Sequence, residues 1–113
     1  MAKRSADETI IRGSDNVFAD LGYADAEERQ TKLRLAYAIN GIVAGQGLTQ
    51  AEAAGLLGIN QPKVSALTNY KLAGFSIERL MTLLTALDRD VDIVIRKRAK
   101  TRGVGGRISV KAA

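Results

Sequence analysis

The sequence contains no cysteine and no histidine. Disulfide bonds, Cys/His zinc sites, thiol nucleophiles and imidazole bases are therefore excluded, and with them most hydrolase and metalloenzyme active sites. No apolar run approaches the roughly 20 residues that span a bilayer, and residues 1–12 lack the apolar centre of a signal peptide. We therefore expect a cytoplasmic protein with no metal, no cofactor and no membrane association.

Aromatic residues are also scarce, at 4% of the 113 residues. The hydrophobic fraction of 46% is nevertheless ordinary for a globular protein, so the core must be built from Leu, Ile, Val and Ala. A chain of this length corresponds to a single domain.

The net charge of +5 is unevenly distributed along the chain. Residues 96–113 hold seven basic side chains and no acidic one, whereas residues 1–95 hold ten basic and twelve acidic side chains, a net charge of −2. A basic protein favours a polyanionic partner such as nucleic acid. Here the excess positive charge lies in the C-terminal segment.

Composition divides the chain into a flexible arm at residues 1–12, a folded domain at 13–97 and a basic disordered tail at 98–113. Residues 13–28 carry five acidic side chains and no basic one. Val17, Phe18, Leu21 and Tyr23 are apolar residues within this acidic stretch, and the first three are the candidates for docking. The stretch is either a solvated surface or a docking site for a protein partner.

Two longer segments show the hydrophobic spacing of amphipathic helices. The first is predicted over residues 25–44, with Asp25 as N-cap and Glu28 three residues later, as in a capping box. The second is predicted over residues 77–87, with Ser76 as its cap. Their apolar stripes are Leu35, Ile39 and Ile42 in the first, and Ile77, Leu80, Leu84 and Leu87 in the second.

Beyond residue 90 the pattern changes to that of a β-strand, predicted at 91–96. Val91, Ile93 and Ile95 would share one face of this strand. A single strand in an otherwise helical chain needs a partner strand, because isolated strands are not stable. We expect a second copy of the chain to supply it, which predicts a homodimer.

Between the two longer helices lie two short ones, predicted at residues 50–57 and 61–70. Thr49 caps the first, with Glu52 completing a capping box, and Asn60 caps the second. The three-residue connection starting at Gly58 is too short for an extended hairpin and sets the helices at a steep angle. Packing at that angle needs a small residue, which we expect to be Ala54.

The outward face of the helix at 61–70 is small, polar and mostly uncharged, since Val64 and Leu67 are expected to face the core. Amides and hydroxyls of this kind suit base edges and phosphate oxygens. Two capped helices joined through a glycine also occur in proteins that do not bind DNA, so plain helical packing is the alternative. The residues of this face are Gln61, Lys63, Ser65, Thr68 and Asn69.

At these residues the chain resembles the phage-repressor-like, Xre/Cro-type helix-turn-helix family. The residues that carry the resemblance are Leu48, Thr49, Gln50, Ala54, Gly58, Ile59, Gln61, Val64 and Ser65. The segments 16–22, 61–65, 75–80 and 87–91 are further similar to HigA-type antitoxins, which autorepress toxin–antitoxin operons. One departure is that a strand stands where the repressor fold has its fifth helix.

The resemblance implies a mainly α, four-to-five-helix DNA-binding domain with its motif at residues 49–71 and a C-terminal strand that pairs across a dimer. It further implies that Gln61 contacts a base and that Gln50 bridges Gln61 to a phosphate. Lys63 and Ser65 would contact bases or phosphates, and Asn69 a phosphate. Three residues would lie at the edge of the footprint: Thr68, Tyr70 and Lys71.

The sequence therefore predicts a repressor of double-stranded operator DNA, the antitoxin and autoregulator of a toxin–antitoxin operon. The alternatives are a stand-alone Xre-type regulator, and a module that mainly occludes a toxin and binds DNA secondarily. RNA binding lacks the stacking aromatics that single-stranded recognition uses. Neighbouring carboxylates, as at Asp88 and Asp90, have cap and strand-edge roles, so we expect no enzymatic activity.

Overall fold

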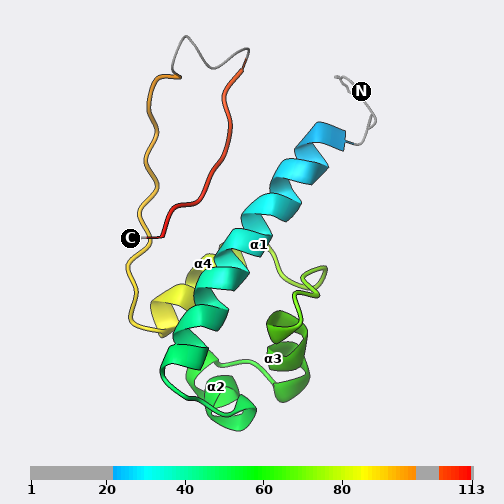
Figure 1. The fold of residues 1–113 in the computed structure, drawn as a ribbon, viewed down its shortest axis with the longest axis vertical. Coiled ribbons are helices and arrows are strands. Elements are labelled where there is room, and N and C mark those ends of the chain that lie inside the picture. Colours follow the sequence, from blue (N-terminus) through cyan, green and yellow to red (C-terminus); the bar gives the residue numbers. More distant parts are fainter. Residues whose placement is uncertain (1–21, 99–104, 113) are drawn as a thin grey trace. The chain divides into compact units, whose positions relative to one another are not determined.

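A computed structural model describes residues 22–98 and 105–112, in which four α-helices occur and no strand. The helices are α1 (Gly22–Gly45), α2 (Gln50–Leu57), α3 (Gln61–Thr68) and α4 (Ile77–Ala86) (Figure 1). The mainly α fold class is thus confirmed. The chain divides into two compact units, residues 1–31 and residues 32–113, and the boundary falls within α1.

Helix α1 begins earlier than its sequence pattern indicates. Its first residue is Gly22, so Asp25 lies inside the first turn and the prediction of an N-cap at Asp25 is wrong. The segment from Ala24 to Glu28 combines alanines with acidic residues. Alanine has the highest helix propensity, and negative charge is favourable near the N-terminus of a helix because of the helix dipole.

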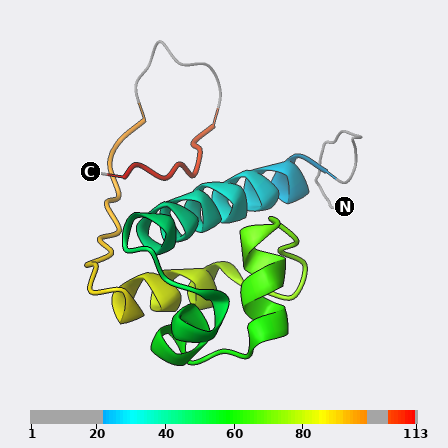
Figure 2. The same cartoon turned by 60° about the horizontal axis from the view of Figure 1, so that its bottom comes forward.

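The core of the unit at residues 32–113 is aliphatic, with Phe75 as its one buried aromatic among the residues described. Helices α2, α3 and α4 pack on one side of the part of α1 that belongs to this unit (Figure 2). On α2 the fully buried small residue is Ala53, while the predicted Ala54 is half-buried beside it. The other buried residues are Leu35, Ala36, Ile39, Leu57, Val64, Leu67, Leu72, Leu80, Leu83, Leu84 and Leu87.

Each helix is followed by a residue with positive φ, where the chain reverses and the last carbonyls are capped. Glycine fills this position after α1 and α2, at Gly47 and Gly58, whereas Tyr70 (φ 59°) and Asp88 (φ 64°) fill it after α3 and α4. Helix α3 therefore ends at Thr68, two residues before the predicted end.

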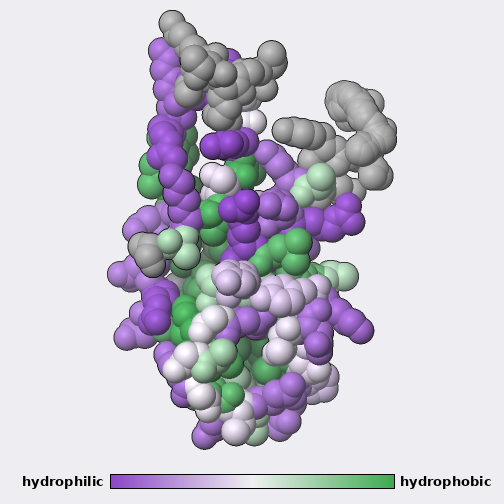
Figure 3. All heavy atoms as spheres, viewed as in Figure 1, coloured by the Kyte–Doolittle hydropathy of each residue, from purple (hydrophilic) through white to green (hydrophobic). Residues whose placement is uncertain are grey.

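The strand predicted at residues 91–96 is not present in the structure: residues 91–98 lie in neither a helix nor a strand. Val91 is half-buried against the core, but Ile93 is 73% exposed and Ile95 is 92% exposed. A strand forms only when it pairs with another strand, and residues 91–98 have none beside them among the described residues of this chain. The sequence pattern predicted that a second copy of the chain supplies the partner. In Figure 3 this segment, on the left, carries hydrophobic side chains next to hydrophilic ones.

Several predicted regions lie partly or wholly outside the described residues. The arm at 1–12 and the docking candidates Val17, Phe18 and Leu21 lie outside them, and of the tail at 98–113 the structure describes residue 98 and residues 105–112. Within the latter segment Val110 is half-buried against the core. In the part of the chain that is described, no helix has the length and apolarity needed to cross a membrane.

Candidate nucleic-acid interface

The N-terminus of α2 is closed by a complete capping box, as the sequence predicts. The Thr49 hydroxyl accepts a hydrogen bond from the Glu52 amide at 3.1 Å, and the Glu52 carboxylate accepts one from the Thr49 amide at 2.9 Å. The one acidic side chain of α2 is thus held by backbone at the helix start. Gln50, the first residue of α2, is exposed beside this cap.

The turn between α2 and α3 is short and hydrogen-bonded. Gly58 adopts a left-handed conformation (φ 71°, ψ 31°) that glycine reaches without steric cost. The amides of Gly58 and Ile59 both donate to the Ala54 carbonyl, at 2.9 and 3.2 Å. Asn60 then caps α3, its side-chain oxygen accepting from the Lys63 amide at 2.9 Å. These bonds fix where α3 starts relative to α2.

Helix α3 has one face in the core and one in solvent. Val64 and Leu67 are buried, at 3% and 1% exposure. Gln61 is exposed, Ser65 is half-buried, and the helix contains no acidic residue. The outer face of α3 therefore presents hydrogen-bonding groups without a negative charge that would repel phosphate.

Two of the predicted contact residues are already hydrogen-bonded within α3. The Thr68 hydroxyl donates to the Val64 carbonyl at 2.9 Å, and the Asn69 side-chain amide donates to the Ser65 carbonyl at 2.9 Å. A phosphate contact needs a donor. Thr68 would have to release its bond to provide one, because a hydroxyl has a single donor, whereas the Asn69 amide keeps a second N–H. Gln61 is exposed at the other end of the helix.

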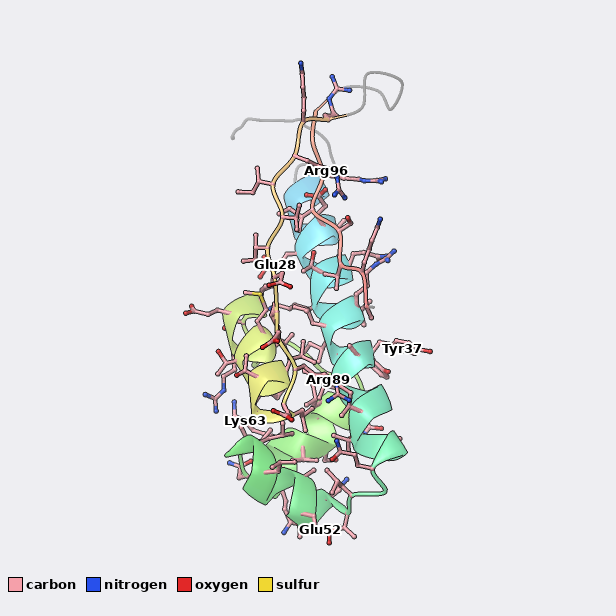
Figure 4. All side chains as sticks on the ribbon, turned by 90° about the vertical axis from the view of Figure 1, so that its left-hand side faces the viewer. Glu28, Tyr37, Glu52, Lys63, Arg89 and Arg96 are labelled. Atoms are coloured by element: carbon pink, nitrogen blue, oxygen red, sulfur yellow. The ribbon has the colours of Figure 1, made fainter. Side chains whose placement is uncertain are left out.

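Lys63 extends from the first turn of α3 to the loop that precedes α4 (Figure 4). Its ammonium lies 5.2 Å from the centre of the Phe75 ring, a cation–π contact, and donates to the Gly74 carbonyl at 3.5 Å. An ammonium has three donors, so this arrangement places a positive charge at the edge of the α3 face and leaves further donors for a phosphate.

The remaining predicted residues occupy different places. Lys71 is exposed just after α3, and Tyr70 is 39% exposed at the positive-φ position. The structure thus brings the residues predicted to contact DNA onto α2, α3 and the turn after α3. The residues predicted for dimerisation belong to the separate C-terminal segment.

One residue that contacts α3 was not predicted from the sequence. The side-chain amide of Asn40, on α1, donates to the carbonyl of Leu67 in the last turn of α3, at 3.0 Å. Asn40 is half-buried. The signal was present, since an amide next to the apolar positions of a predicted helix is unfavourable for the helix and needs a tertiary reason.

Comparison with known proteins agrees with this geometry. A helix-turn-helix domain family matches residues 17–96 of the chain. A solved structure named as an XRE family transcriptional regulator is 70% identical to this chain, covers 79% of it and 99% of its own length, and superposes with a TM-score of 0.75. No curated protein matches the chain.

Proposed function

Because the chain belongs to the Xre-type helix-turn-helix family, we propose that it is a transcriptional regulator that binds operator DNA with α3 in the major groove. The observation that carries the proposal is the division of α3. Val64 and Leu67 anchor it in the core, while Gln61 and Lys63 project outward from its first turn on a face without acidic residues. A recognition helix reads base edges with residues near its N-terminus.

Each outward residue has a role that its chemistry supports. The Gln61 amide both donates and accepts, so it can form paired hydrogen bonds with an adenine. Gln50 lies at the start of α2, where the helix dipole and the side-chain amide favour a phosphate. Lys63 adds a positive charge, and Ser65 and Lys71 extend the surface along α3 and beyond it.

The test separates base reading from backbone binding. Operator duplexes are first selected from random DNA by the wild-type protein, and binding is then compared with that to scrambled duplexes. Gln61→Ala should lose about 1–3 kcal/mol of discrimination and retain most nonspecific binding. Gln50→Ala should weaken binding to both duplexes. Gln46→Ala, which removes an exposed glutamine outside the motif, is the control. Unchanged discrimination by Gln61→Ala would refute base reading by this residue.

We further propose that the protein acts as a homodimeric repressor whose C-terminal segments pair across a two-fold axis. The support is a run of exposed β-branched residues, Ile93, Val94 and Ile95, which buries no side chain in this chain. A dimer would place two α3 helices about 34 Å apart, one turn of DNA. Sedimentation of Ile93→Asp should give monomers, and a persistent dimer would place the interface elsewhere.

The regulatory context we propose is a toxin–antitoxin operon, in which the protein represses its own transcription and neutralises a toxin. The support is the similarity to HigA-type antitoxins noted from the sequence, together with the exposed Ile93–Ile95 segment, which also suits a protein partner. Co-expression with an adjacent toxin-sized reading frame should rescue growth and yield a complex. A locus without such a neighbour would instead favour a stand-alone regulator.

A further inference from the structure

We propose that Asn40 is a positioning residue for DNA reading: it sets the orientation of α3, and thereby of Gln61, without contacting DNA. This inference rests on the function proposed above. Asn40 lies on α1, outside the helix-turn-helix motif, and is 27 residues from its hydrogen-bond partner in the chain.

The bond is made at the C-terminal end of α3. The last carbonyls of a helix have no partner within the helix. The Leu67 carbonyl accepts from the Tyr70 amide at 3.1 Å, and the Asn40 side chain donates to the same oxygen at 3.0 Å. Asn40 therefore adds a donor from outside the helix to this carbonyl and ties the end of α3 to α1.

A directional restraint matters here because α3 has only eight residues. Helices this short are held in place by tertiary contacts rather than by their own hydrogen bonds. The apolar contacts of Val64 and Leu67 hold α3 against the core, but hydrophobic contacts are not directional. The hydrogen bond from Asn40 fixes the position of the backbone itself.

The two ends of α3 are restrained in complementary ways. At its start, Lys63 contacts Phe75 and Gly74, and Asn60 caps the helix. At its end, Asn40 holds the Leu67 carbonyl. Asparagine is a poor helix former, and a residue of similar size such as leucine would serve packing equally well. The amide at position 40 is accounted for by its bond to α3.

The test uses Asn40→Leu, which keeps the bulk and removes the donor, and Asn40→Asp, which keeps the shape and replaces the donor by an acceptor. Binding to selected operator duplexes and to scrambled duplexes is measured over a range of salt. We expect operator preference to fall by about threefold to thirtyfold, the range seen for residues that act through others. The salt slope should not change, because no phosphate contact is lost.

Ile42→Val is the matched control, since Ile42 is half-buried against the core on the same helix. It should lower stability and leave operator preference unchanged. A double variant supplies the sharper readout. If Asn40 acts by placing Gln61, then Asn40→Leu should reduce operator preference less in the Gln61→Ala background than in wild type.

A second measurement does not depend on DNA. Nitrogen–proton correlation spectra of Asn40→Leu should show shifts of the α3 amides, residues 61–68, beyond those caused by Ile42→Val. If wild type prefers its operator and Asn40→Leu prefers it equally, Asn40 is only structural and the inference is overturned. If wild type prefers no DNA sequence, the proposed function fails as well. If Asn40→Asp does not fold, Asn40→Leu decides.

Discussion

At position 70 a glycine variant should be more stable than an alanine variant, whereas inside a helix alanine is the more stabilising of the two. Tyr70 follows α3 with a φ of 59°, and the two amides around this position cap the helix: Tyr70 donates to Leu67 at 3.1 Å and Lys71 donates to Ala66 at 2.8 Å. The conformation is therefore fixed by the end of the helix and cannot relax to negative φ without losing these bonds.

The comparison of Tyr70→Gly with Tyr70→Ala isolates this backbone effect, because both variants remove the same ring. A residue with a Cβ lowers the stability of the folded state by about 1–2 kcal/mol in the left-handed region. Glycine lowers stability by about 0.4–1 kcal/mol in another way, because it increases the conformational entropy of the unfolded chain. The glycine variant should therefore be more stable by about 0.5–1 kcal/mol. For a domain of this size the difference corresponds to a Tm about 2–6 °C higher.

The assay is thermal and urea unfolding followed by far-ultraviolet circular dichroism, which reports the helices. Ala66→Gly is the control, because position 66 lies inside α3, where glycine is less favourable than alanine. This variant should lose about 1 kcal/mol of stability. Asp88, at φ 64° after α4, offers the same pair of variants at a second site. If Tyr70→Ala proved as stable as Tyr70→Gly, the reasoning that positive φ is enforced here would be refuted.

Three further changes test other parts of the structure. Gly58→Ala should cost about 0.5–1 kcal/mol in urea unfolding, because its φ of 71° is strained for alanine by more than glycine loses in unfolded-state entropy, although the added Cβ would meet no neighbouring atom within 4 Å. Lys63→Met should lower the slope of log affinity against log salt by about one and cost at most about 1 kcal/mol of stability, as expected of an exposed cation–π contact; an unchanged slope would exclude a phosphate contact. Replacing the five basic residues of 98–113 by glutamine should flatten the salt dependence and preserve operator preference; a shifted preference would show that the tail reads sequence.

Local signals in the sequence predicted most of the motif. Thr49 with Glu52, Asn60 and Ser76 each form the caps that their residue types indicate, because these side chains satisfy the free amides of the very next turn. Gly58, which opens the predicted connection, adopts a left-handed conformation for the same local reason. Such interactions span three or four residues and can be read from a single sequence.

The features that escaped prediction depend on distant partners or on competition between local signals. Asn40 acquires its role only when α3 lies beside it, 27 residues later in the chain. Asp25 resembles a cap, but good helix-forming residues around it carry the helix back to Gly22. Tyr70 gives no local sign of a positive φ, because tyrosine rarely adopts one.

The C-terminal segment illustrates a different limit. Its alternation of β-branched residues indicates extended backbone, but whether it is a strand depends on a partner, which the residues themselves do not identify. Ile93 and Ile95 are exposed, so whether this segment becomes a strand depends on whether the protein assembles with a partner that covers them.

In α3 the residues that stabilise the fold are largely separate from those that face outward, and this separation affects how the protein can evolve. Stability is supplied by Val64, Leu67, the cap at Asn60 and the contact of Lys63 with Phe75, while Gln61 projects into solvent. Substitutions at exposed positions usually alter stability by no more than about 0.5 kcal/mol. Duplicated copies of the gene could thus acquire new DNA targets by single substitutions on the outer face of α3 while retaining the same folded scaffold.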